Sequence, residues 1–101
     1  MSYQYQSNTD SKLYLKKPRQ YMVIMHNDDY TTMDFVVEVL ISVYNKTEAE
    51  AKEIMLSIHN NGSGTAGAYV YDIAMTKKIQ TEQLAGQKGF PLRITLDEME
   101  G

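Results

Sequence analysis

Side chains that can bind a charged group and an apolar one occur together in a single short stretch, residues 27–35. The stretch opens with Asn27, Asp28 and Asp29, and it becomes apolar from Met33 onward. Amide and carboxylate oxygens accept hydrogen bonds, and a free α-amino group, with a pKa of about 7.7–8.0, is largely charged at neutral pH. The stretch therefore predicts a site for the charged end and the first side chain of a peptide.

The same acidic residues also have a structural explanation, which the sequence leaves open. Acidic side chains at a helix N-terminus interact favourably with the helix dipole, and Thr31 with Asp34 three residues later resembles a capping box. A second candidate, His59, ends an apolar helical stripe with Met55 and Ile58. Its neutral ring can accept a hydrogen bond from an amine, or the residue can simply mark the boundary of the apolar face.

A catalytic or metal-binding site has little support in the sequence. The candidate ligands His26, Asp28, Asp29 and His59 follow neither the HExxH pattern nor an EF-hand loop. The chain has no cysteine, and no serine stands in a nucleophile elbow. We therefore expect no metal, no cofactor and no enzymatic activity.

Composition and charge narrow the possible partners and the location of the protein. The chain has 101 residues, enough for one domain. Its net charge of −3 argues against a nucleic-acid partner, which a basic stripe normally marks. No apolar run approaches the roughly 18 residues of a membrane span, and the N-terminus lacks the blocks of a signal peptide. We expect a cytoplasmic monomer that contacts neither membrane nor nucleic acid.

The hydrophobic pattern predicts an extension followed by one folded domain. Residues 1–19 are polar and predict a flexible N-terminal extension, which leaves 20–101 as the core domain. In the core the pattern predicts strand, helix, helix, strand, helix and strand at residues 21–26, 32–44, 47–59, 65–71, 73–84 and 91–96. We expect an α+β fold in the order β-α-α-β-α-β, a two-layer α/β sandwich with three helices on one face of a three-stranded antiparallel sheet.

Local signals set several of these boundaries. Thr47 with Glu50 predicts a capping box, and Gly62 predicts a left-handed C-cap. Asp72 is expected to cap the third helix, and Gly86 and Gly89 to stop it. The inward face of that helix is expected to be a weak apolar stripe on a half-exposed helix: Ile73, Met75 or Thr76, Ile79, and Gln83 or Leu84.

A nearly continuous motif begins at Asn27-Asp28-Asp29-Tyr30-Thr31 and includes Met33 and Phe35-Val36. It closely resembles the NDDYTPMEFV motif of the ClpS family, adaptors that hand N-degron substrates to a Clp AAA+ unfoldase. The similarity covers roughly residues 18–98 and includes the segment Met55–His59, Gly62, Gly67, Lys77 and Pro91-Leu92. The family fold has the same β-α-α-β-α-β order as the one predicted from the hydrophobic pattern.

The resemblance implies a role for individual residues. Asn27, Asp28 and His59 would hold the α-amino group of a substrate whose first residue is Leu, Phe, Tyr or Trp. Met33 matches the position that excludes β-branched side chains. The pocket for the first side chain would be lined by Thr31, Met33, Val36, Met55, Ile58 and Leu92.

The resemblance also implies delivery to a protease. Asp72 and Lys77 match a surface that docks the N-terminal domain of a ClpA-type unfoldase, which passes substrates to ClpP, and residues 1–19 match a segment that the unfoldase engages. Thr32 stands where the family usually has Pro, which predicts a looser helix start. Asp72 stands where Glu is common. The alternative is a non-catalytic interaction domain that binds a folded partner without recognising a free N-terminus.

Overall fold

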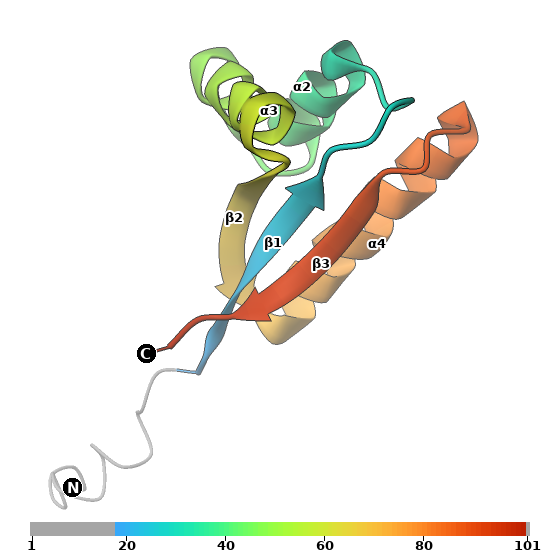
Figure 1. The fold of residues 1–101 in the computed structure, drawn as a ribbon. Helices are drawn as coiled ribbons and strands as arrows, with labels where there is room; N and C mark the ends of the chain where they lie inside the picture. The colour runs from blue at the N-terminus through green and yellow to red at the C-terminus, as the bar shows by residue number, and fades with distance from the viewer. Residues whose placement is uncertain (1–17, 101) are drawn as a thin grey trace, which may run out of the picture.

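The computed structural model describes residues 18–100, so residues 1–17 of the expected extension lie outside the described part. Six elements follow one another in the predicted order (Figure 1): β1 (Gln20–His26), α2 (Met33–Ser42), α3 (Glu48–Asn61), β2 (Ser63–Val70), α4 (Tyr71–Lys88) and β3 (Arg93–Glu98). The strands form one antiparallel sheet in the order β2-β1-β3. The predicted α+β fold is confirmed.

The central strand β1 fixes where the core lies. Its alternate residues Val23 and Met25 are fully buried, as expected for a strand that presents one face to a core. The ladder to β2 slips by one residue at this point, because Val23 pairs with Gly67 whereas Ile24 pairs with Thr65. A bulge of this kind increases the local twist of the strand. In Figure 1, α4 runs along the sheet behind β1 and β3, and α2 and α3 lie at the end toward which β1 points.

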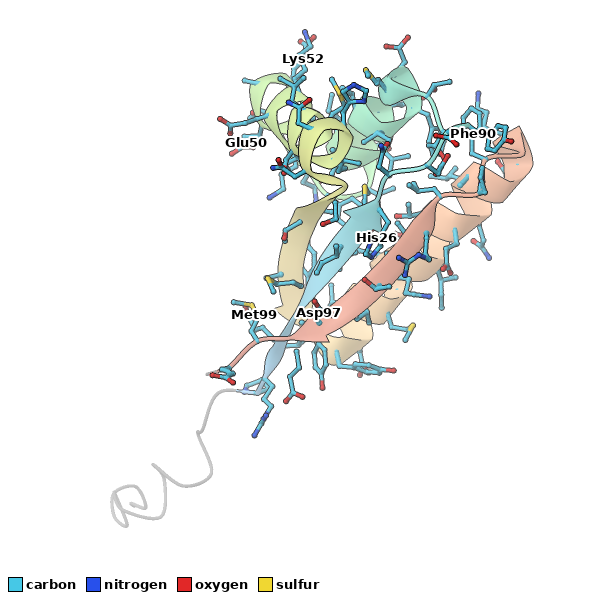
Figure 2. All side chains as sticks on the ribbon, in the orientation of Figure 1. His26, Glu50, Lys52, Phe90, Asp97 and Met99 are labelled. Atoms are coloured by element: carbon cyan, nitrogen blue, oxygen red, sulfur yellow. The ribbon has the colours of Figure 1, made fainter. Side chains whose placement is uncertain are left out.

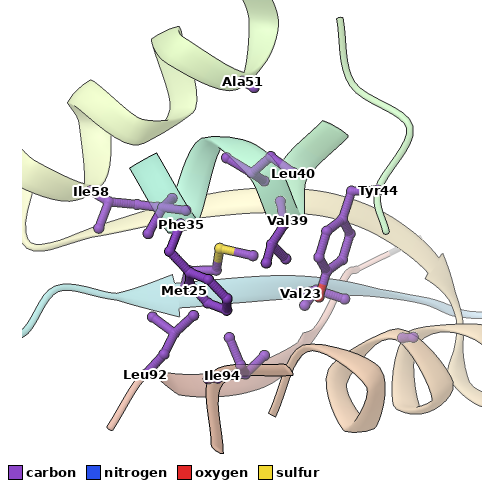
Figure 3. Packing of buried hydrophobic residues seen from close by; sticks show 14 residues of the cluster. Val23, Met25, Phe35, Val39, Leu40, Tyr44, Ala51, Ile58, Leu92 and Ile94 are labelled. Atoms are coloured by element: carbon purple, nitrogen blue, oxygen red, sulfur yellow. The ribbon is translucent and has the colours of Figure 1, made fainter. Parts of the chain in front are cut away.

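The apolar side of α2 packs onto the inward face of the sheet. Figure 3 shows Val39 and Leu40 of α2 beside Met25 of β1, within one buried cluster. At the start of α2, Phe35 meets Phe90 edge to face, with ring centroids 5.1 Å apart. Burying side chains of this size stabilises the fold by about 1.5–3 kcal/mol each. The N-terminal turn of α2 is thereby held firmly against the sheet.

Both local signals for α3 are confirmed. The Thr47 hydroxyl accepts a hydrogen bond from the Glu50 backbone N–H at 3.1 Å, and the Glu50 carboxylate accepts one from the Thr47 N–H at 2.9 Å. Figure 2 shows Glu50 and Lys52 pointing away from the core. The helix runs to Asn61, two residues beyond its predicted end, and Gly62 caps it with a left-handed φ of 93°.

The start of α4 differs from the prediction. Tyr71, predicted to end a strand, is the first residue of the helix, and Val70 is its N-cap without a side-chain hydrogen bond. Asp72 therefore lies inside the first turn, where the helix dipole favours an acidic side chain, and it does not cap the helix. The Tyr71 ring packs edge-on against Tyr21, with centroids 5.2 Å apart. This tertiary contact outweighs the strand preference of an aromatic residue.

The inward face of α4 also differs from the prediction. Ile73 and Ile79, expected to point inward, are 47% and 46% exposed, whereas Ala74, Thr81 and Ala85 are buried. Small side chains let a helix backbone approach a sheet closely, so burial here follows size and not hydrophobicity. The helix continues through Gly86, and Gly89, the second glycine predicted to stop it, caps it with a φ of 75°.

The C-terminal end of α2 is attached to α4 through polar groups. The Lys77 ammonium donates to the Val43 carbonyl at 2.7 Å, at the C-cap of α2, which ends two residues before its predicted end at Tyr44. Tyr44 and Thr81 share a hydrogen bond at 2.7 Å, and Thr81 also donates to the Lys77 carbonyl at 2.8 Å. Burial raises the pKa of Tyr44 to about 12, so its hydroxyl stays neutral at physiological pH.

Removing the Lys77 ammonium should destabilise the fold. Lys77→Met is expected to lower the free energy of unfolding by about 1–3 kcal/mol, because hydrogen bonds to charged groups are typically worth about 1.5–3 kcal/mol. Urea denaturation of the purified protein measures this. Lys78→Met is the matched control, since between residues 18 and 100 Lys78 pairs with Glu82 alone, in the next turn, and its loss should change the value by less than about 0.5 kcal/mol. Equal losses in both variants would contradict a special role for Lys77.

Candidate functional site

A pocket of about 430 Å³ opens where β1 ends. Its walls come from the loop after β1, the first turns of α2 and the last turns of α3. A volume of this size suits a small-molecule ligand or a single amino-acid side chain with its backbone. The lining residues are Asn27, Asp28, Asp29, Tyr30, Thr31, Thr32, Met33, Val36, Met55, Ile58 and His59.

The two walls of the pocket are joined through the backbone. The Asn27 N–H donates to the Gly62 carbonyl at 2.9 Å, and the Gly62 N–H donates to the Ile58 carbonyl at 3.0 Å. Gly64 allows the close approach of α3, because a Cβ there would lie only 2.8 Å from Cγ1 of Ile58. The end of α3, with His59, is therefore placed directly beside the loop that follows β1.

Asp28 holds that loop in shape. Its Oδ1 accepts hydrogen bonds from the backbone N–H of Tyr30 at 2.8 Å and of Thr31 at 2.7 Å, and its Oδ2 accepts one from the Thr31 hydroxyl at 2.7 Å. Partial burial would raise the pKa of the Asp28 carboxyl, but these hydrogen bonds outweigh burial and hold the pKa below its usual range. An ionised carboxylate has about four acceptor sites, so one site on Oδ2 stays open to a ligand.

The capping residue of α2 is one position later than predicted. The Thr31 hydroxyl is used by Asp28 and does not cap the helix. Thr32 is the N-cap, and its hydroxyl accepts a hydrogen bond from the Phe35 N–H at 3.1 Å. Thr and Pro both favour helix starts, but only Thr adds a side-chain acceptor. The helix start is therefore capped by the residue that was expected to loosen it.

The apolar wall combines fixed and adaptable side chains. Val36 and Ile58 are buried, whereas Met33 is 44% exposed and Met55 is partly exposed. Methionine is flexible and polarizable, so it can fit several apolar shapes. Leu92, expected in this wall, is buried in the hydrophobic core and is not among the residues that line the pocket. In Figure 3 it lies near Met25, beside Ile94.

The polar rim faces solvent. Asn27 and His59 are exposed, and the hydrogen bonds of residues 18–100 leave both of their side chains uncommitted. His26, a further candidate, lies outside the pocket and shares a hydrogen bond with the Thr95 hydroxyl at 2.7 Å. The rim thus offers an amide oxygen, a carboxylate oxygen and an imidazole nitrogen as possible acceptors.

The described residues contain neither a cluster of metal ligands nor a helix that could span a membrane. Between residues 18 and 100, no three metal-ligating side chains come together. None of the helices in this same range has the length and apolar character needed to cross a membrane.

The two residues expected to dock an unfoldase lie apart from the pocket, on α4. Asp72 is exposed and borders a second hollow of about 450 Å³, together with Pro18, Arg19, Tyr21, Val70 and Tyr71. Lys77 directs its ammonium to the Val43 carbonyl. Five positions on a helix correspond to a rotation of roughly 140°, so Asp72 and Lys77 do not share one face of α4.

Eight of the nine residues predicted to contact a ligand line the pocket. Tyr30 and Thr32 line the pocket as well. From the sequence, Tyr30 has no predicted role, and Thr32 is noted only as a difference from the family's usual Pro. Both lie within the motif that resembles the ClpS family, so the motif already indicated their position. What the sequence could not show is that Tyr30 points outward at the rim, where it is 73% exposed.

Comparison with known proteins decides the family. A family model described as "ATP-dependent Clp protease adaptor protein ClpS" matches residues 16–95. The chain belongs to the ClpS family. The resemblance inferred from the motif is confirmed, and the ClpS adaptors are not a family of enzymes, in line with the expectation of no catalytic activity.

Individual relatives agree with this assignment. The ClpS adapter of Clostridium acetobutylicum is 48% identical over 95 residues, covering 94% of each chain. That of Acetivibrio thermocellus is 52% identical over 82 residues, covering 81% of this chain and 83% of the relative. The structure of Agrobacterium tumefaciens ClpS2 bound to L-phenylalaninamide matches with a TM-score of 0.78 at 35% identity, covering 82% of this chain and all of that one. The chain is thus an adaptor of a Clp protease, a class that binds a Clp unfoldase and its substrates.

The hydrogen bonds of Asp28 generate a pH-dependent prediction for stability. A lowered pKa means that the ionised carboxylate stabilises the fold above the ordinary carboxyl pKa, and that this stabilisation disappears as pH falls through the lower folded-state pKa. Asp28→Asn should cost about 1–2 kcal/mol of unfolding free energy at neutral pH. The difference from the unmodified chain should stay constant from pH 8 to about pH 5 and narrow below about pH 4.

Chemical denaturation at a series of pH values measures this difference. Asp29→Asn is the control, because Asp29 is the exposed neighbour and surface substitutions usually change stability by less than about 0.5 kcal/mol. The role of Asp28 would be contradicted if the difference in unfolding free energy stayed constant down to the lowest pH measured, or if Asp29→Asn produced the same difference.

Proposed function

We propose that this ClpS-family chain binds proteins by a free N-terminal Leu, Phe, Tyr or Trp and delivers them to a ClpA-type AAA+ unfoldase for degradation by ClpP. It acts in the cytoplasm as a monomer. The observation that carries the proposal is the pocket itself, in which acceptors for a charged amine stand at the rim of an apolar wall. L-Phenylalaninamide, named in the structure of the Agrobacterium relative, has the two complementary features: a free α-amino group and an apolar side chain.

The rim residues have complementary roles toward the amine. An ammonium group has three N–H donors, and the rim offers three acceptors: the Asn27 amide oxygen, the open site on Asp28 Oδ2 and a neutral nitrogen of His59. Each hydrogen bond to a charged group is worth about 1.5–3 kcal/mol. Burying a Leu or Phe side chain gives about 1.5–3 kcal/mol in total. Two or three amine contacts therefore outweigh the side-chain contribution.

The apolar wall would select the first side chain. Thr31, Met33, Val36, Met55 and Ile58 line the space below the rim, with Met33 as the residue that excludes β-branched side chains. The sixth proposed contact, Leu92, belongs to the buried cluster that continues from Val36 and Ile58. It would form the floor reached by a long side chain such as that of Phe.

Delivery would use residues of α4 that lie apart from the pocket. Asp72 is exposed and available to the N-terminal domain of the unfoldase, while Lys77 contributes through the part of its side chain that its bond to α2 leaves accessible. Residues 20–101 are proposed as the adaptor core and residues 1–19 as the extension that the unfoldase engages. No catalytic group is needed for this role, because the adaptor only binds and transfers.

Fluorescence anisotropy with two labelled peptides tests the proposal. One peptide begins with a free Phe, and the other is identical but N-acetylated. Acetylation removes the charge and the donors on which most of the binding energy rests, so affinity should fall by at least about 100-fold, the loss of roughly one to two charge-assisted hydrogen bonds. Equal binding of both peptides, or binding of neither, would instead favour an interaction domain for a folded partner.

Replacing His59 should show how the amine is held. His59→Ala is expected to weaken binding of the free-Phe peptide by about 10-fold or more. The loss should be confined to peptides with a free N-terminus, because an acetylated N-terminus has no ammonium group to donate to the ring.

Anisotropy titrations of both proteins with the free-Phe peptide measure this. Asn60→Ala, next to His59 on the exposed end of α3 and outside the pocket lining, is the control. Unchanged affinity in His59→Ala would show that another group holds the amine.

A further inference from the structure

Tyr30 is the most exposed of the large apolar side chains in residues 18–100. It is 73% exposed, whereas the other large apolar side chains that are exposed in this range have exposed fractions of 40% to 50%. It nevertheless lines the pocket, at the turn between β1 and α2. A large aromatic ring left in water at the edge of a pocket contributes little to folding, and aromatic side chains in such places are typical contacts for a binding partner.

The backbone that carries this ring is fixed although the ring itself is exposed. The Tyr30 N–H donates to Asp28 Oδ1 at 2.8 Å, and the next residue is held by the same carboxylate through two further hydrogen bonds. A tyrosine has only two side-chain torsions that determine the ring position, so ordering it costs little conformational entropy. The backbone that carries the ring is therefore preorganised, and contact with a ligand would order only the ring and not the loop.

We propose that Tyr30 contacts the second residue of the bound peptide and favours a large apolar side chain there. This inference rests on the proposed function, in which the first residue occupies the pocket. Consecutive Cα atoms are about 3.8 Å apart, so the second residue is the first to lie outside the pocket and must pass the rim. Met33, which is 44% exposed, lines the same pocket and adds further apolar surface to it. A glycine at the second position would leave both surfaces in water.

Four labelled peptides separate this inference from the function on which it rests. Three begin with a free Phe and continue with Leu-Gly, Gly-Leu or Gly-Gly, and the fourth is the N-acetylated form of the Leu-Gly peptide. Each is titrated against the full chain and against Tyr30→Ala, Tyr30→Phe and Tyr71→Ala. The last variant is the matched control, because Tyr71 is also an exposed tyrosine but borders the second hollow on α4.

The expected result is a loss confined to one peptide. Tyr30→Ala should weaken the Phe-Leu-Gly peptide by about three- to tenfold, a usual effect of removing an aromatic contact, and should leave Phe-Gly-Gly and Phe-Gly-Leu within about twofold. Tyr30→Phe should retain the preference, since it keeps the ring and removes only the hydroxyl. Tyr71→Ala should bind all peptides as the unmodified chain does.

Other outcomes overturn the inference in recognisable ways. Equal weakening of all three free-Phe peptides by Tyr30→Ala would show that the residue acts on the first-residue pocket or on the loop. A loss limited to Phe-Gly-Leu would assign Tyr30 to the third residue, and no loss at all would leave it without a role in binding. If the unmodified chain bound the acetylated peptide as well as the free one, the proposed function itself would fail, and the second-residue contact with it.

Discussion

The pocket depends on one backbone hydrogen bond, from the Asn27 N–H to the Gly62 carbonyl. It continues the ladder between β1 and β2, in which His26 pairs with Ser63, beyond the point where the strands end. Through it, the loop that carries the polar residues is joined to the end of the helix that carries His59. Because β1 is the central strand and is paired on both sides, the site is built on the most constrained part of the sheet. The positive φ of Gly62 and the missing Cβ of Gly64 are the local conditions for this junction.

Asp28 shows why the polar motif had two valid interpretations in the sequence. Three of its hydrogen bonds are structural, since they shape the turn that precedes α2. The same bonds lower the pKa of the carboxyl and leave one acceptor site of Asp28, a residue that lines the pocket, without a partner among them. A structural role and a binding role are thus compatible in one side chain. Removing the carboxylate would disturb the shape of the rim as well as its charge, so stability and binding have to be measured together.

The parts of the fold that were predicted correctly are those determined by local signals. The capping box of Thr47 with Glu50 and the left-handed Gly62 can be recognised from a few neighbouring residues. On α4 the errors arose where tertiary contacts decided the outcome, because packing against the sheet buries the small Ala74 and Ala85 and leaves larger residues exposed. At α2 a local contact decided it, because the Thr31 hydroxyl donates to Asp28 and Thr32 becomes the cap. In the pocket, the motif indicated which residues gather there, but not that Leu92 lies behind the wall.

The preorganisation of the pocket has a consequence for selectivity. The loop is held by hydrogen bonds from its own residues, and α2 is fixed at its start by the Phe35–Phe90 contact and at its end by Lys77. Little ordering is left to be done when a ligand binds, so most of each new contact contributes to affinity. Adaptability is confined to the two methionines of the wall, which can accommodate side chains of different shape. Under the proposed function, such a site would tolerate variation in the apolar side chain more than loss of the amine, because a ligand without the amine would cover the rim acceptors without donating to them. An adaptor that recognises bulky N-terminal residues would need this difference to reject internal or blocked ones.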